Sequence, residues 1–376
     1  MLPCRKEARV ADPTSSEPAT TPQRVAPERL EQFLTEVFQR LGAPPGRARR
    51  AAATLVLADR RGIGSHGAAR LGFYVRRIEN GTIDPRADLT VLRENPATLA
   101  LDAHDGLGLA LAPEAMDRCI AKAETAGVAL CTVRNSSHFG IGAAYVLSAA
   151  ERGFAALAMT NAGPLVAPLF GAEARLGTNP IAFAAPVGPD EPPLVLDMAT
   201  SAVAFGKIEL ARRANSAIPP GWAIDAAGAP TTDPFAARSL APLGGDTAGG
   251  GHKGYGLAVM VDMLCGPLAG ALWGTQVASL QTVEARSGIG HVFFVWRIDA
   301  FRDPVAFAAD ARALLAALRA TPPAPGHEAS GVLVPGDPER AAERERRARG
   351  IPFPASVIGE LRALGERLGV PFELDG

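Results

Sequence analysis

The sequence predicts an α/β protein in which a mixed core of strands and helices is joined by a layer of helices from both chain ends. Helical periodicity dominates the two ends of the chain, and short β-prone segments alternate with helical ones between them. With 376 residues, 47% of them hydrophobic, the chain can bury a large core. We expect three parts: a disordered tail over 1–25, a helical domain formed by 26–80 with 300–376, and an α/β domain over 81–299.

The spacing of apolar residues places the elements in order. Leu30, Phe33, Leu34 and Val37 recur at helical intervals, and a second helix follows the PPG break at 44–46. The expected helices are 27–41, 47–61, 68–78, 112–126, 142–152, 305–319 and 354–368, with 339–349 as a solvated helix face. The expected strands are a hairpin over 90–102, then 128–133, 155–160, 181–185, 194–197 and 292–298.

Two segments need separate treatment. Pro and Gly dominate 219–251, which is typical of loops at a site. The 19 residues 256–274 carry a single charge, Asp262, and approach the length of a membrane span. Because they contain four glycines and a proline, we expect a buried helix of a soluble protein.

Composition limits the class of function. The formal net charge is −1, which argues against a nucleic-acid partner, since phosphate binding draws on a basic excess. The four cysteines form no CxxC pair, and the N-terminus lacks the order of a signal peptide. We therefore expect a cytoplasmic enzyme without disulfides that acts on a small molecule and does not bind membranes.

The sequence does not match the common dinucleotide-binding, P-loop, hydrolase or metal-binding motifs. The two GxG segments carry Leu111 and Tyr145 where a dinucleotide-binding GxGxxG motif has its third glycine. Lys253 is followed by Gly254, which breaks the P-loop pattern, and Ile63 replaces the first glycine of a hydrolase elbow before Ser65. The six histidines show no HxxxH spacing, so we expect no metal site.

Polar residues instead stand in glycine-rich turns, where a backbone can approach a ligand closely. The segments that carry them are RGIGSHGAARL, SSHFG, LGTNPIAFAAP, DMATS with GKIELA, IPPGWAID, TTDP and GGGHKGYGLA. Together and in this order they resemble the type-2 malate/L-lactate dehydrogenase family. Its relatives include ureidoglycolate, sulfolactate and 2,3-diketogulonate oxidoreductases and Δ1-piperideine-2-carboxylate reductases.

The resemblance runs from about Arg47 to the C-terminus and has several implications. It implies an oxidoreductase that uses NAD or NADP on a non-Rossmann fold, in agreement with the failed GxGxxG. It also implies a homodimer with active sites near the subunit interface. The helical part would then serve substrate binding and dimerisation, and 81–299 would bind the cofactor.

Reduction of a 2-oxo acid needs a proton donor and a cation for the carboxylate. The resemblance points to His66 as the donor, with Ser65 as a relay and Asp197 as the carboxylate that orients the imidazole or caps a helix. Arg70 lies four residues after His66, so on a helix it would face the same side and clamp the substrate. Tyr74, four residues further, would close that face, and His138 resembles the second active-site histidine.

The resemblance places cofactor contacts in the strand-end turns and in the last glycine-rich loop. Lys207 and Lys253, two of only four lysines, suit phosphate contacts, and Arg212 and Arg213 suit a 2′-phosphate. The expected cofactor residues are His138, Asn161, Thr178, Asn179, Pro180, Met198, Ala199, Thr200, Ser201, Lys207, His252, Lys253 and Gly254.

Three positions depart from the family pattern. Gly64 stands where Asp is usual, Ser137 where Asn is usual, and Trp296 where a smaller residue is common. The first two lie near the expected chemistry, so the substrate can differ from malate or lactate. A small 2-oxo or 2-hydroxy acid is the leading hypothesis, and a cyclic imine carboxylate is the alternative.

Two hypotheses from other functional classes remain open. An inactive family member would serve as a scaffold, although the chemistry-bearing residues are intact. A hydrolase built on Ser65, His66 and Asp197 lacks the nucleophile elbow, and we expect that the adjacent Ser65 and His66 side chains cannot point at one another.

Overall fold

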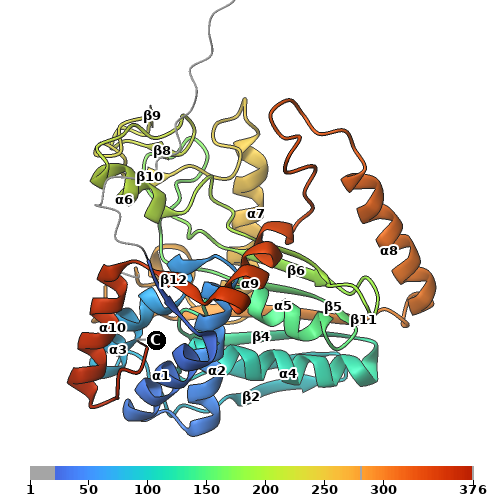
Figure 1. Ribbon diagram of the computed structural model, residues 1–376, viewed down its shortest axis with the longest axis horizontal. Coiled ribbons are helices and arrows are strands. Elements are labelled where there is room, and N and C mark those ends of the chain that lie inside the picture. Colours follow the sequence, from blue (N-terminus) through green and yellow to red (C-terminus); the bar gives the residue numbers. More distant parts are fainter. Residues whose placement is uncertain (1–21, 280–281, 375–376) are drawn as a thin grey trace, which may run out of the picture.

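The computed structural model describes residues 22–279 and 282–374. A seven-stranded sheet lies at its centre, in the order β2-β3-β4-β11-β5-β6-β7 (Figure 1). β3 and β4 are parallel and all other neighbours are antiparallel, so the predicted mixed α/β class is confirmed. The strands are β2 (Thr90–Asn95), β3 (Thr98–Asp102), β4 (Val128–Ser136), β5 (Phe154–Thr160), β6 (Ile181–Ala185), β7 (Leu194–Met198) and β11 (Ile289–Arg297).

Helices cover both faces of this sheet. α4 (Gly108–Ala126) links the parallel strands β3 and β4, and it packs with α5 (Ala143–Ala150) in one apolar cluster on the sheet. The opposite face meets α7 (Gly251–Met263), whose Val261 packs with Met159 and Val292. Burial on both faces explains why β5 is almost continuously apolar and why β4 is apolar over 128–133 except at Thr132.

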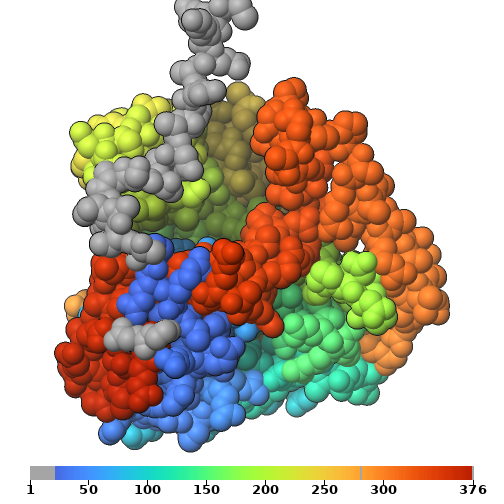
Figure 2. Space-filling view, in the orientation of Figure 1, coloured from blue at the N-terminus to red at the C-terminus, as the bar shows by residue number. Residues whose placement is uncertain are grey.

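Both ends of the chain meet in a second apolar cluster. α1 (Pro27–Arg40), α2 (Pro45–Arg60), α3 (Leu71–Glu79) and α10 (Ala355–Leu368) contribute to it. β1 (Gln23–Val25) pairs antiparallel with β12 (Ile351–Phe353), and Figure 2 shows the two chain ends side by side in blue and red. The last residues of the predicted tail therefore form a strand, and residues 1–21 of that prediction lie outside the described residues.

Two C-terminal helices behave differently from the prediction. α8 (Pro304–Arg319) stands on the opposite side of the molecule from α10 (Figure 1), and its one buried residue, Leu315, packs with Val187 and Val334. α9 (Asp337–Arg349) has a charged face that is not simply solvated. Its Glu343 pairs with Arg60 and Arg61 at the end of α2.

The predicted loop region 219–251 contains three short strands. β8 (Ala223–Ile224), β9 (Pro230–Thr231) and β10 (Ser239–Leu240) form a small sheet beside α6 (Phe205–Arg213), with a core that includes Val166 and Ile208. Strands of two residues leave no periodicity for a sequence to show, since alternation needs about four residues.

The prediction of one buried helix over 256–274 is wrong. α7 begins earlier, at Gly251, and passes into a π-helical turn, Leu264–Leu268, at Pro267, which cannot donate a helical hydrogen bond. One side is open to solvent, with Met263 57% and Trp273 50% exposed. Among the described residues, none of the helices has the length and apolar content needed to cross a bilayer.

Candidate active site

Two histidines from separate elements lie face to face. His66 ends a 3-10 turn, Gly64–His66, that follows α2, and His138 lies in the loop after β4. Their rings are stacked with centroids 5.5 Å apart and an interplanar angle of 27°. The fold therefore brings together the two histidines that the sequence singled out.

The Ser65 hydroxyl lies 3.0 Å from Nδ1 of His66. The expectation that adjacent Ser and His side chains cannot point at one another is wrong, because the 3-10 turn places both on one side. Arg70 supports this turn, since its Nε donates to the backbone carbonyl of Ser65 at 2.8 Å. Ser65, His66 and Arg70 thus form one polar unit.

Arg70 reaches His66 by a route other than the predicted helix. A second 3-10 turn, Ala68–Arg70, is separated from the first by Gly67, which has extended backbone angles. The i, i+4 argument is therefore wrong, although the residues still lie close together. Burial and the nearby Arg70 charge lower the pKa of His66 to about 4, so its imidazole is neutral near pH 7.

Tyr74 serves His138 directly. Its hydroxyl lies 2.6 Å from Nδ1 of His138, and its side chain is fully buried in α3. Burial raises the pKa of Tyr74 well above its usual value and lowers the pKa of His138 well below its own. The hydroxyl therefore donates to a neutral ring. Tyr74 thus orients His138, and the substrate contact expected from the sequence stays a prediction.

Asp197 has a different partner from the predicted one. It lies in β7, and its Oδ2 accepts a hydrogen bond from the N–H of Ala143, the first residue of α5, at 2.8 Å. Asp197 therefore caps α5, and not the helix that was expected to follow it in the chain. Among the hydrogen bonds of the described residues, none joins Asp197 to His66. Burial raises the pKa of Asp197 to about 6.

Two of the family departures have structural explanations. Ser137 is buried; its Oγ donates to the carbonyl of Gly106 and accepts from the N–H of Gly108. Its hydroxyl therefore braces this loop. Trp296 packs on Phe183 in β6, with ring centroids 6.1 Å apart. Gly64, in contrast, belongs to the turn that carries His66.

Several predicted cofactor residues have side chains already engaged within the protein. Asn161 donates to Asp262 and accepts from Gly290, and Asn179 joins Ala162 to Ala258. The hydroxyls of Thr200 and Ser201 donate to nearby backbone carbonyls. These side chains fix the strand-end turns, so a ligand there would meet mainly backbone groups.

Other predicted cofactor residues remain open to solvent. Lys207 lies over the Trp222 ring at 5.8 Å, and His252 and Lys253 are exposed in the first turn of α7, which is helical where a loop was expected. Arg212 is partly engaged, because its Nε and Nη2 donate to the carbonyls of Pro234 and Ala237. Partial exposure is shared by Thr178, Pro180, Met198 and Ala199, whereas Gly254 is buried.

Sequence reasoning missed His291. It is fully buried in β11, with its two ring nitrogens 2.8 Å from the hydroxyls of Thr160 and Ser136. Its ring stacks on Phe139, the neighbour of His138, with centroids 4.7 Å apart. A single histidine in the apolar run HVFFVW was the available signal.

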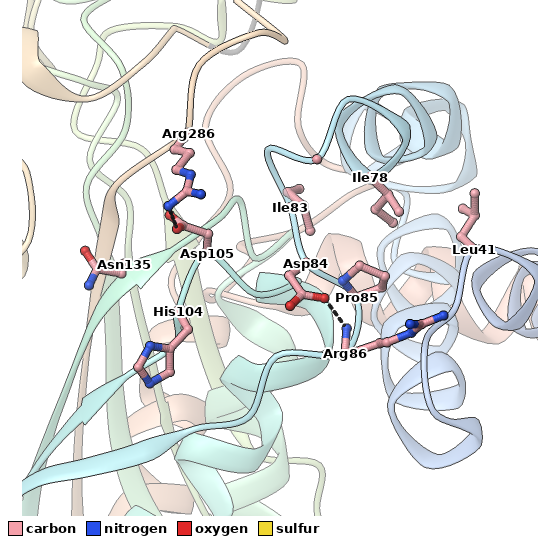
Figure 3. A pocket seen from close by; sticks show the side chains of 11 residues that line it. Leu41, Ile78, Ile83, Asp84, Pro85, Arg86, His104, Asp105, Asn135 and Arg286 are labelled. Atoms are coloured by element: carbon pink, nitrogen blue, oxygen red, sulfur yellow. Dashed lines mark hydrogen bonds and ion pairs between the residues drawn. The ribbon is translucent and has the colours of Figure 1, made fainter.

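A cavity of about 730 Å³ lies elsewhere in the molecule (Figure 3). Asp105 and Arg286 form an ion pair in its wall at 2.7 Å, and Asp84 and His104 also line it. None of the predicted site residues lines this cavity. The described residues contain no group of three or more His, Cys, Asp or Glu side chains that could hold a metal.

The chain is similar to known dehydrogenases over most of its length. The family model described as malate/L-lactate dehydrogenase matches residues 25–362. Malate dehydrogenase of Pyrococcus horikoshii is 39% identical over 92% of this chain and 96% of its own. Delta(1)-pyrroline-2-carboxylate reductase of Ancylobacter novellus is 37% identical over 81% of this chain and 86% of its own.

Solved structures agree with this assignment. The malate dehydrogenase of Entamoeba histolytica superposes with a TM-score of 0.88 at 32% identity, covering 94% of this chain and 100% of that one. The fold and its matches define an oxidoreductase. More particularly, the chain belongs to the malate/L-lactate dehydrogenase family, which confirms the resemblance drawn from its motifs.

Proposed function

We propose that the enzyme transfers a hydride between NAD(P)H and a small 2-oxo or 2-hydroxy acid at the His66–His138 pair. The observation that carries this proposal is the state of His66. Its imidazole is neutral, Nδ1 is engaged by Ser65, and its ring is partly exposed and stacked on a second neutral histidine. Such a ring can give or take a proton at Nε2 beside a reacting carbonyl.

Ser65 and His66 act together in this proposal. When Nε2 of His66 gives its proton to the carbonyl oxygen, the Ser65 hydroxyl can supply a proton to Nδ1. This relay lets a ring with a low pKa act as an acid without first becoming an imidazolium. Ser65 is exposed, so water can restore its proton.

Arg70 is the proposed substrate clamp. Its Nε holds the Ser65 carbonyl, and among the hydrogen bonds of the described residues its two Nη groups have none. A guanidinium fixed through Nε presents those Nη groups to a carboxylate. Arg70 thereby links the position of the substrate to that of the His66 turn.

The residues present fit a phosphorylated dinucleotide. Lys207 and Lys253 are exposed, and α7 begins at Gly251 without a side-chain cap. The N–H groups of Gly251 and Lys253 already donate to the carbonyls of Asp246 and Gly250, so an anion at this helix end would be held mainly by the Lys253 ammonium group. The bound nicotinamide supplies or accepts the hydride. The remaining contacts would come from the turns that carry Asn161, 178–180 and 197–201. These features support either NAD or NADP.

An imine carboxylate is the second candidate substrate. It is favoured by the 37% identity to a pyrroline-2-carboxylate reductase. Both substrates present an sp² carbon next to a carboxylate, so Arg70 and His66 would keep their roles.

The test is oxidation of NADH and NADPH with pyruvate, oxaloacetate and Δ1-piperideine-2-carboxylate. Turnover of a keto acid supports the leading proposal, and turnover of the imine alone replaces it with the second. Binding of the reduced cofactors is measured by nicotinamide fluorescence. If neither NADH nor NADPH binds, the hypothesis of an inactive scaffold protein is favoured. The same assay on His66→Ala should show turnover lower by about 10²–10⁴ with cofactor binding kept.

We also propose a cytoplasmic homodimer that pairs through the apolar side of α7 and the following turn. Met260, Met263, Leu268 and Trp273 are all at least 42% exposed there. The buried free thiols of Cys119, Cys131 and Cys265 support a reducing compartment. The division into a helical domain for the substrate and an α/β domain for the cofactor is part of the same proposal. Because α7 belongs to the α/β part, the proposed pairing surface lies there and not on the helical part that the sequence suggested.

A further inference from the structure

A buried carboxyl group lies against the Ser65–His66 turn. It belongs to Asp59, near the end of α2, which is 1% exposed. Oδ2 accepts a hydrogen bond from the N–H of Ala68 at 2.7 Å, whereas the equally buried Oδ1 has no hydrogen-bond partner. A buried oxygen without a partner destabilises a fold. Its position against the candidate active site suggests that it serves the turn.

The carboxyl group fills the inside of the bend between the two 3-10 turns. A Cβ added to Gly67 would lie 1.9 Å from Oδ1 of Asp59, and one added to Gly64 would lie 3.7 Å from it. Gly67 has φ −93° and ψ −150°, which any residue can adopt. Glycine is therefore required at 67 by the contact with Asp59 and not by its backbone.

Charged groups reach Asp59 from α9. Arg346 donates to the backbone carbonyl of Asp59, and its charge favours the ionised carboxylate. Glu343 on the same helix is engaged by Arg60 and Arg61. The C-terminal helix α9 therefore contributes one cation to the environment of this carboxyl group.

The other neighbours of Asp59 are the turn and the apolar core. His66 and Arg70 are the titratable and charged groups of the turn, and Arg70 holds the carbonyl of Ser65. α4 and α5 present apolar side chains to this end of α2, where Ala58 packs in their cluster. Asp59 thus connects α2, α9 and the turn through one side chain.

We propose that Asp59 is a positioning residue of the Ser65–His66 turn. Its ionised carboxylate accepts the hydrogen bond from the Ala68 N–H and packs on Gly67. Protonation of the carboxylate weakens this hydrogen bond, so the activity falls when acidification protonates Asp59. This inference rests on the proposed role of His66.

The energetics give the direction of the effect. Burial raises the pKa of Asp59 to about 7, while His66 stays neutral down to about 4. A hydrogen bond to an ionised acceptor is roughly twice as strong as one to a neutral acceptor. Between pH 5 and pH 8 the hold on Ala68 therefore changes while the charge of His66 does not.

The first test is the pH profile of kcat/KM. In the wild type it should fall as the pH drops through about 7. Asp59→Asn keeps the shape of the side chain but removes its charge. It should lower kcat/KM about tenfold at pH 8.5 and abolish the fall of kcat/KM near pH 7, which we call the acid limb. Arg346→Met should move the acid limb to higher pH, because it removes a charge that favours the ionised carboxylate. Arg344 is an exposed arginine of the same helix, and Arg344→Met should leave the limb in place.

Asp197 is the competing source of such a limb, because its pKa is about 6. A limb that survives in Asp59→Asn with the wild-type midpoint, or that disappears only in Asp197→Asn, would overturn the proposal.

The second test uses the contact at Gly67. Gly67→Ala should reduce kcat/KM at least tenfold in the wild type, because the new methyl group meets Asp59. In an Asp59→Ala background the same change should cost less than twofold, because the space is then free. Equal losses in both backgrounds would contradict the contact.

A third readout does not depend on turnover. The His66 ¹³Cε1 resonance, assigned with His66→Gln, should shift with a midpoint near pH 7 in the wild type and in Arg344→Met, but not in Asp59→Asn. If this shift is present and no substrate is turned over, the proposed function fails and the role of Asp59 in the turn stands. If turnover is present and the shift is the same in Asp59→Asn, the inference fails alone.

Discussion

The Tyr74 hydroxyl and the backbone N–H of Gly140 both point to Nδ1 of His138, at 2.6 Å and 3.4 Å. Two donors on one nitrogen fix the tautomer, so Nε2 of His138 carries the proton. The second histidine is therefore presented as a hydrogen-bond donor. Tyr74 therefore fixes the orientation of the His138 ring, and its predicted contact with the substrate stays a prediction.

Replacing Tyr74 by Phe should lower kcat/KM about tenfold, because Nδ1 of His138 loses its stronger donor inside the protein. Steady-state kinetics measures the loss, and cofactor fluorescence shows whether binding is kept. Tyr145→Phe is the matched control, since Tyr145 bonds to the carbonyl of Phe139 and not to His138. An equal loss in both variants would point to general loosening of the core.

Arg70→Lys should raise KM for carboxylate substrates about tenfold and also lower kcat. Lysine cannot hold the Ser65 carbonyl and present a fork to a carboxylate at the same time. Kinetics with a substrate and with its uncharged amide separates the two effects: the amide should show the kcat loss without the KM loss. A variant with changed KM and unchanged kcat would remove Arg70 from its role in supporting the turn.

Lys253→Met should weaken cofactor binding about tenfold, with a smaller dependence of the affinity on salt than in the wild type. Titration of nicotinamide fluorescence at two ionic strengths measures both. Lys122→Met is the control, because Lys122 lies on α4 and pairs with Glu94. If both lysine variants bind the cofactor equally, Lys253 is an ordinary surface residue.

Stability should fall as the pH drops below about 6.5. Burial lowers the pKa of His291 to about 3, that of His66 to about 4 and that of His138 well below its usual value. The unfolded chain therefore binds three protons in this window that the folded chain does not bind. Each such histidine removes up to about 1.4 kcal/mol per pH unit in this window. The raised pKa values of Asp59 and Asp197 act in the opposite direction, because their protonated forms favour the folded state up to about pH 6 to 7. These two carboxyl groups offset two of the three histidines, so the net loss is about 1.4 kcal/mol per pH unit.

The measurement is thermal unfolding of the wild type and His291→Gln between pH 4.5 and pH 8. The variant should be less stable at pH 8, because it breaks the bonds to Thr160 and Ser136. Its loss of stability with falling pH should nevertheless be shallower. Parallel curves for the two proteins would show that His291 does not contribute to the acid sensitivity.

Met263→Asp should shift the protein from dimer to monomer, because it places a charge on the apolar side of α7. Light scattering after gel filtration measures the mass. Val91→Asp is a control on an exposed side chain of the edge strand β2. A monomeric wild type would contradict the proposed dimer directly.

Long periodic segments and the motif set were predictable from the sequence. α1, α2, α4 and α10 follow the apolar spacing, and the order of the glycine-rich segments was enough for the family. Short strands such as β8 and β9 were not predictable, because two residues carry no pattern. The position of α8 was also missed, since an amphipathic spacing shows which side packs but not what it packs against.

The site divides in the same way. The sequence by itself determined the residue types, since His66, His138, Ser65 and Arg70 stand in recognisable turns and imply proton transfer beside a carboxylate. Only the tertiary structure decided the partners that are distant in the chain: Tyr74 for His138, Ala143 for Asp197 and Ala68 for Asp59. The physical reason is that hydrogen bonds and burial depend on which segments the fold packs together. Neither the neutral state of the histidines nor the raised pKa of Asp59 follows from neighbours along the chain.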